Sequence, residues 1–180
     1  QKPVQVAVFS NGDEVELIQN GTSVGKLTSG TRLAAELPHS FLFDLTYLPG
    51  TLEAVSYKDG KEISRDTLVT TGPAKELRLI QEKKELSANG HEVAYVRVEI
   101  VDENGIVVPD AALRLSAAVE GVGSLAAFGS SNPITDENYT SGTFTSYHGT
   151  ATAIIRSGYQ TGMCTLTVGC EELDEKKIAF

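Results

Sequence analysis

Hydrophobic and polar residues alternate along most of this chain, and no stretch keeps the period of an amphipathic helix. Valine occupies every second position from Val4 to Val8, and residues 96–100 repeat the pattern with Val, Val and Ile. Residues 113–119 and 150–155 alternate in the same way. Because successive side chains of a strand point to opposite faces, this alternation predicts β-strands with one buried face.

Turn signals separate the alternating segments. Asn20-Gly21 and Asp59-Gly60 each stand between two extended segments, and both pairs are typical of two-residue hairpin turns because these residue types tolerate positive φ. Short strands bounded by such turns at regular spacing indicate β-sandwiches. The sequence therefore predicts an all-β fold made of two tandem immunoglobulin-like β-sandwich domains.

The boundary between the two predicted domains falls in residues 70–75, where Gly72-Pro73 interrupts the alternation. The predicted domains are residues 1–72 and residues 73–180. The first contains 6 basic and 9 acidic side chains, net −3, and the second contains 9 and 15, net −6. Because the linker between these two acidic domains is short, we expect them to pack together.

The charge balance limits the classes of partner. The chain has 15 basic and 24 acidic side chains, which gives a net charge of −9. Nucleic acids and anionic membrane surfaces favour basic patches, so we expect neither a nucleic acid nor a membrane as a partner. Cys164 and Cys170 lie six residues apart in one predicted strand. That separation is too long for a disulfide between them.

One long polar stretch, residues 129–149, interrupts the strand pattern. Loops of this length inside a compact domain are often functional, and the rigid end of a sandwich is where such loops are carried. We expect a partly exposed, mobile loop whose deletion from Ser130 to Ser146 changes the free energy of unfolding by no more than about 1–2 kcal/mol. Its amides and aromatic rings are the candidate contacts for a ligand or a neighbouring domain: Asn132, Asn138, Tyr139, Tyr147 and His148.

No arrangement of residues indicates catalysis or metal binding. Acidic residues are numerous, but they lie in predicted turns or on polar strand positions, where nothing would raise the pKa of a carboxyl group as glycoside hydrolysis requires. His39, His91 and His148 lack the spacing of metal ligands. Residues 21–25 match Gly-x-Ser-x-Gly, the pattern of a nucleophile elbow. Such an elbow needs a helix after the serine, and no helical period follows here. We predict no catalytic residue, no metal ligand and no cofactor.

Several segments resemble the C-terminal accessory domains of family 2 glycoside hydrolases, the β-galactosidases and their relatives. The first predicted domain resembles the fourth domain of those enzymes, and the second resembles the immunoglobulin-like domain that follows it. The resemblance covers nearly the whole chain. It is carried in the first domain by residues 8–21, 23–25, 49–60 and 66–70, and in the second by residues 86–90, 96–105, 108–111, 129–133 and 147–149.

The resemblance has consequences for function. In that family the two catalytic glutamates lie on a TIM barrel upstream of these domains, and no segment here matches the barrel. The resemblance therefore implies a bacterial, polysaccharide-degrading parent enzyme and no catalytic residue in this chain. We expect a non-catalytic accessory region that packs on the upstream catalytic domains of the same chain and shapes the rim of the active site.

Two other functions agree with the sequence. The first is an independent carbohydrate-binding module that uses the 129–149 loop, where amides would bind sugar hydroxyls and rings would stack on the sugar. The second is a cell-surface immunoglobulin-like stalk or adhesin segment, which sequence flanking this chain would reveal as further repeats.

Overall fold

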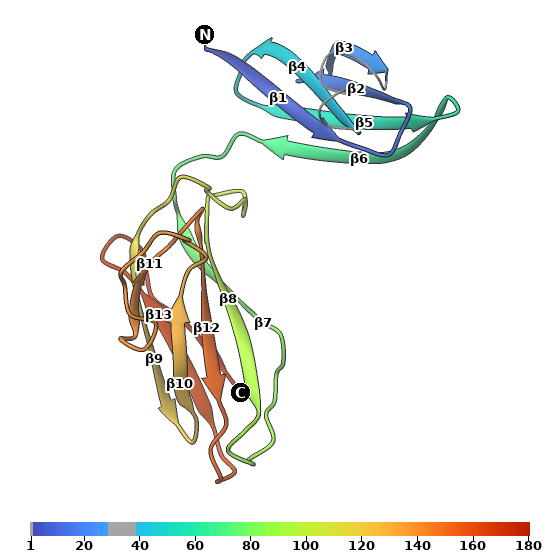
Figure 1. The fold of residues 1–180 in the computed structure, drawn as a ribbon. Helices are drawn as coiled ribbons and strands as arrows, with labels where there is room; N and C mark the ends of the chain where they lie inside the picture. Colours follow the sequence, from blue (N-terminus) through green and yellow to red (C-terminus); the bar gives the residue numbers. More distant parts are fainter. Residues whose placement is uncertain (1, 29–38) are drawn as a thin grey trace. The chain divides into compact units, whose positions relative to one another are not determined.

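The computed structural model describes residues 2–28 and 39–180 (Figure 1). The described residues form fourteen strands and no helix, so the all-β prediction is confirmed and none of them belongs to a membrane-spanning helix. The chain divides into two compact units, Gln1–Thr70 and Thr71–Phe180, called unit 1 and unit 2 below. The Gly72 amide donates a hydrogen bond of 2.9 Å to Oδ2 of Asp102, so Gly72 is tied to unit 2.

Unit 1 is a sandwich of two unequal sheets. β1 pairs with β4 in a two-stranded antiparallel sheet, and the other four strands form a sheet in the order β3-β2-β5-β6. The hairpins at Asn20-Gly21 and Asp59-Gly60 have positive φ at both residues, as the sequence predicts. The strands are β1 (Pro3–Phe9), β2 (Glu14–Gln19), β3 (Thr22–Thr28), β4 (Ser40–Thr46), β5 (Thr51–Lys58) and β6 (Lys61–Val69).

The core of unit 1 lies between its two sheets. Val15 and Leu17 of β2 pack against Phe41 and Phe43 of β4, and all four side chains are buried. The period-two pattern explains this arrangement, because every second residue of each strand faces the opposite sheet.

Unit 2 is a sandwich of two four-stranded sheets. One sheet has the order β10-β12-β8-β7 and the other has the order β11-β9-β13-β14. Val96, Val98 and Ile100 of β8 are fully buried between the sheets, as their alternation predicts. The strands are β7 (Glu76–Gln81), β8 (Val93–Val101), β9 (Arg114–Gly121), β10 (Ser124–Gly129), β11 (Thr143–Thr145), β12 (Thr150–Arg156), β13 (Cys164–Gly169) and β14 (Lys176–Ala179).

The polar stretch 129–149 is not the projecting loop that the sequence suggested. Residues 143–145 form β11, which pairs with β9 and places Phe144 opposite Leu115. Phe144 is fully buried in the core of unit 2, and Ser146 is buried as well. A deletion from Ser130 to Ser146 would remove a strand and a core aromatic side chain, so the expectation of a small stability change is wrong.

Candidate functional site

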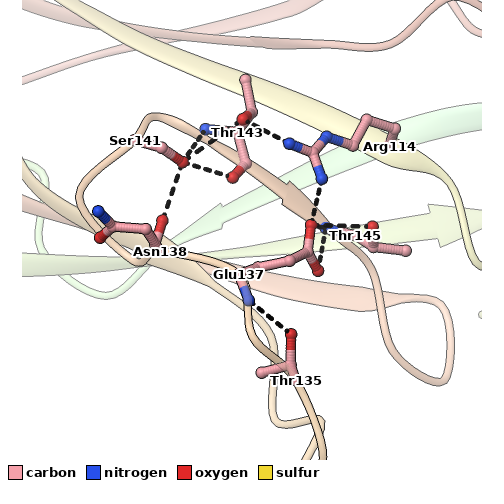
Figure 2. Close-up of polar contacts among 7 residues, drawn as sticks. All are labelled: Arg114, Thr135, Glu137, Asn138, Ser141, Thr143 and Thr145. Atoms are coloured by element: carbon pink, nitrogen blue, oxygen red, sulfur yellow. Dashed lines mark hydrogen bonds and ion pairs between the residues drawn. The ribbon is translucent and has the colours of Figure 1, made fainter.

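Glu137 is the polar centre of the 129–149 segment (Figure 2). Both of its carboxylate oxygens accept hydrogen bonds from the Thr145 amide, at 3.1 and 3.2 Å, and Oε1 also accepts one from the Thr145 hydroxyl at 3.1 Å. Arg114 of β9 forms an ion pair with the same carboxylate and donates a second hydrogen bond, of 2.9 Å, to the Thr143 hydroxyl. Glu137 thus fastens the segment to strands β11 and β9.

The two asparagines proposed as ligand contacts hold the turns of their own segment. Oδ1 of Asn132 accepts a hydrogen bond of 3.0 Å from the Ile134 amide. Oδ1 of Asn138 accepts hydrogen bonds of 2.9 Å from both the amide and the hydroxyl of Thr140. These are Asx-type turns, in which the side-chain oxygen replaces a backbone acceptor. The amide oxygens therefore already have a structural role.

Tyr139 anchors the segment with its ring. The ring stacks on Phe144 at a centroid distance of 4.8 Å, with 30° between the ring planes. It also covers Gly129, where an added Cβ would lie only 2.2 Å from Cδ1 of the tyrosine. Phe128 donates a backbone hydrogen bond of 2.7 Å to the Tyr139 carbonyl. Tyr139 is therefore held by Phe144, Gly129 and the backbone of β10.

Tyr147 and His148 belong to a tight turn that leads into β12. The Tyr147 and Thr150 backbones exchange hydrogen bonds of 2.9 and 3.1 Å, and His148 and Gly149 between them both have positive φ. This is the geometry of a two-residue hairpin turn. The two rings touch at a centroid distance of 4.1 Å, and the histidine is exposed.

The structure gives the predicted contact residues two sets of local contacts. Tyr147 and His148 are in contact with each other, while Asn138 and Tyr139 bind their own turn and the core. The sequence missed Glu137, which organises the segment, because a single acidic residue in a polar stretch gives no signal before its partners are known.

Several carboxyl groups have pKa values that are lowered, whereas a catalytic acid needs a raised pKa. Lys176 lowers the pKa of Glu76, and backbone amides led by Gly72 lower that of Asp102. Hydrogen bonding to Lys83 and Ser87 lowers the pKa of Glu92 to about 2. A general acid for glycoside hydrolysis needs a raised pKa, so these groups are suited to structural ion pairs and hydrogen bonds.

The described residues offer no cluster of three or more His, Cys, Asp or Glu side chains that could bind a metal ion. Cys164 and Cys170 are both free thiols, in agreement with the spacing argument. Burial raises the pKa of both thiols, which keeps them protonated and unreactive at neutral pH.

Unit 1 has an open apolar face. Leu52 of β5 pairs with Leu68 of β6, and both point to the same side of the sheet as the core, yet every residue of β6 is exposed. A groove of about 320 Å³ lies here, and its apolar lining includes Val8, Phe9, Leu52 and Leu68. Phe9 is 70% exposed and Leu68 is 64% exposed. Figure 1 shows why, since β1 and β4 form a narrower layer than the sheet that they cover.

The fold and these surfaces define a protein of tandem immunoglobulin-like β-sandwiches. A family model described as glycoside hydrolase family 2 C-terminal domain 5 matches residues 77–179, and a domain of unknown function, DUF4982, matches residues 1–64. The chain belongs to glycoside hydrolase family 2, as part of the C-terminal region of a β-galactosidase-like member.

Two curated β-galactosidases are similar to this chain, in agreement with the family match. A β-galactosidase of Bacteroides ovatus is 28% identical over 165 residues, which cover 92% of this chain and 19% of the relative. A β-galactosidase of Thermoanaerobacter pseudethanolicus is 33% identical over 144 residues, covering 74% of this chain and 19% of the relative. The chain thus spans about a fifth of the length of the curated relatives it matches.

Solved structures match nearly the whole chain. A family 2 glycosyl hydrolase of Bacteroides cellulosilyticus has a TM-score of 0.91 and 30% identity, over 99% of this chain and 22% of that one. A β-glycosidase of Bacteroides vulgatus has a TM-score of 0.87 and 28% identity, over 99% of this chain and 22% of that one. The fold of both units therefore occurs within larger family 2 glycoside hydrolases.

Proposed function

We propose that this chain is a non-catalytic accessory region that packs on the catalytic domains of its parent family 2 glycoside hydrolase and shapes the rim of the active site. The observation that carries the proposal is the open face of unit 1, where Phe9 and Leu68 lie exposed around an apolar groove. Exposed apolar surface of this kind marks contact sites, because its burial against a partner is favourable.

The partner is the upstream part of the same parent chain. Relatives of this chain are about five times as long, which supplies a covalently linked neighbour at high effective concentration. We assign the two accessory domains to unit 1 and unit 2, whose boundary after Thr70 lies two residues before the predicted one, with unit 1 as the domain that docks.

The proposal includes the absence of turnover by the 180-residue chain alone. Its support is the direction of the shifted carboxyl pKa values, which are lowered at Glu76, Glu92 and Asp102. An assay of the isolated chain on nitrophenyl galactosides should match buffer. Hydrolysis that disappears after a single Glu→Gln substitution would overturn this part of the proposal.

The docking face is tested in the full-length gene product. Leu68→Thr and Phe9→Ala remove apolar surface that the proposal buries against the catalytic domains, so each should lower the Tm of the parent enzyme by about 2–4 °C. In the isolated 180-residue chain both side chains are exposed, and each change should alter the free energy of unfolding by less than about 0.5 kcal/mol.

Ile134→Thr is the matched control, because Ile134 is an apolar side chain of unit 2 that is 87% exposed. It should leave both the Tm of the parent enzyme and the free energy of unfolding of the isolated chain unchanged. The docking face would lie elsewhere if Leu68→Thr and Phe9→Ala left the Tm of the parent enzyme unchanged, or if Ile134→Thr lowered that Tm instead.

A further inference from the structure

A second groove, separate from the predicted contact residues, lies at one end of unit 2. Three connections contribute to it, together with Cys164 of β13 and Phe180. The connections are residues 85–88 between β7 and β8, residues 122–123 between β9 and β10, and residues 157, 158 and 160–162 between β12 and β13. Its volume is about 390 Å³. The hairpin turn at His148 precedes β12, whereas residues 157–162 follow it, so the two lie at opposite ends of that strand.

Tyr159 lies beside this groove, between the groove-lining residues Gly158 and Gln160, and is 77% exposed. Its ring lies against Gly90, where an added Cβ would be 2.3 Å from Cζ and 2.6 and 2.7 Å from the two Cε atoms. The edge of the ring meets His91 at a centroid distance of 6.4 Å. One face of the ring is therefore supported by backbone, while its high exposure leaves the other face open.

The connection beneath Tyr159 is held in place by hydrogen bonds. Gly90 donates a backbone hydrogen bond of 3.0 Å to the Gly158 carbonyl. The Glu92 carboxylate accepts one of 2.7 Å from the Ser87 amide and forms an ion pair of 2.8 Å with Lys83. Because the ring is supported and the loop is tied, the protein would lose less conformational entropy when a ligand binds here.

The groove lining combines apolar atoms with a few neutral polar groups. Gln160 supplies an amide, and Ser87, Ser157 and Thr161 supply three hydroxyls. Glu85 is the one charged side chain among the described residues that line it. No basic side chain is in this lining, and unit 2 is acidic overall. An anionic ligand would therefore meet an unfavourable potential.

We propose that this groove binds a neutral oligosaccharide, with the C–H face of one pyranose ring stacked on the open face of Tyr159. Such a sugar has an apolar ring face and hydroxyls at its edge, which match an aromatic ring beside amide and hydroxyl groups. The site is independent of the docking face of unit 1, so either proposal can fail without the other. Tyr139 offers a smaller platform, because Phe144 and Gly129 contact its ring and it is 46% exposed, against 77% for Tyr159.

The test is an NMR titration of the ¹⁵N-labelled 180-residue chain at millimolar sugar concentrations. The probes are β-1,4-galactotetraose and cellotetraose as neutral sugars and tetragalacturonate as their anionic counterpart. A neutral probe should shift amide signals in residues 85–92 and 157–163 and leave the signals of unit 1 unchanged. Tetragalacturonate should bind more weakly than the neutral probes.

Two variants and one control locate the contact. Tyr159→Ala should weaken binding of the neutral probe about tenfold, and Gln160→Ala should weaken it by a smaller factor. Tyr95→Ala is the matched control, since Tyr95 is 46% exposed on β8 and does not line the groove. Its affinity should equal that of the unchanged chain.

Several results would overturn the proposal. These are no shifts with either neutral probe, shifts confined to other residues, equal affinity in Tyr159→Ala, or tighter binding of tetragalacturonate. Unchanged amide signals of the free Tyr159→Ala protein outside the loop would show that it is folded, and Gln160→Ala repeats the test without altering the tyrosine.

Discussion

The two units have the same sandwich plan but differ in how completely their sheets cover each other. In unit 2, two four-stranded sheets face each other, and a central strand such as β8 is buried along most of its length. Among the described residues of unit 1, a two-stranded sheet faces a four-stranded one, and β6 is exposed along its whole length. A sheet face without a partner layer keeps its apolar residues in water, so unit 1 has stabilising burial still to gain.

Under the proposed function, this difference separates two kinds of contribution to the parent protein. Unit 2 carries its own core and presents loops and turns at its ends, which suits a stable spacer or a ligand-binding domain. Unit 1 has a small core and an apolar face, which suits a domain stabilised by its neighbour. The first two predictions below test whether the 129–149 segment belongs to the closed core of unit 2, and the last tests the loop at the other end of that unit.

The largest expected effect is at Phe144, the core aromatic of that segment. Phe144→Ala should lower the free energy of unfolding of unit 2 by about 3–5 kcal/mol, because it leaves a cavity in a fully buried site. Denaturant unfolding followed through amide signals of residues 71–180 measures this loss. Phe9→Ala in unit 1 is the contrasting variant, and its effect should be below about 0.5 kcal/mol in the isolated chain.

Equal effects of Phe144→Ala and Phe9→Ala would contradict the comparison of the two units. A small effect at Phe144 would mean that the 129–149 segment is a dispensable loop after all.

A smaller effect is expected at Glu137, which fastens the same segment. Glu137→Ala removes the acceptor of the Thr145 amide and hydroxyl and leaves Arg114 without its carboxylate, so unit 2 should lose about 1–3 kcal/mol. Glu175→Ala is the control, because the Glu175–Lys177 pair is about 60% exposed on both sides (61% and 60%). That substitution should change the free energy of unfolding by no more than about 0.5 kcal/mol. A similar loss in both variants would mean that the Glu137–Arg114 pair contributes no more than an exposed surface pair.

The local features of the fold could be predicted from the sequence. The alternation at Val96, Val98 and Ile100 correctly placed these residues in the core, and the positive φ at Asn20 and Asp59 agrees with their hairpin dipeptides. These features depend on a few neighbouring residues, which is why pattern and turn chemistry are sufficient. The family resemblance, carried by such turn-and-strand segments, is confirmed by the family match.

The remaining features depend on contacts between distant segments. β11 is three residues long, too short for alternation to reveal, and its pairing with β9 spans about thirty positions of sequence (Thr143 with Ser116). The exposure of β6 depends on the width of the opposite sheet, which no pattern within β6 encodes. The groove beside Tyr159 needs three connections brought together, so Tyr159 could be noted as an aromatic residue but not located.

The smallest expected effect concerns pH and the loop at the other end of unit 2. Hydrogen bonding to Lys83 and then to Ser87 holds the pKa of Glu92 at about 2, below its ordinary value of 4.5. A carboxyl group whose pKa is lowered by folding contributes stability that is fully present above its unfolded pKa and is lost as the pH falls through its folded pKa. The contribution of Glu92 should therefore be complete above pH 4.5 and disappear toward pH 2.

Glu92→Gln should consequently be less stable than the unchanged chain at neutral pH, and the difference should shrink as the pH falls from 4.5 to about 2. The difference should be modest, because Lys83 and Glu92 are 47% and 26% exposed and solvent screens their attraction. Denaturant unfolding of unit 2 at several pH values measures it, with Glu103→Gln, at an exposed turn position, as the control. Parallel pH profiles for the unchanged chain and Glu92→Gln would show that this carboxylate does not hold residues 85–88, and the loop beneath Tyr159 would then lack the rigidity argued for it.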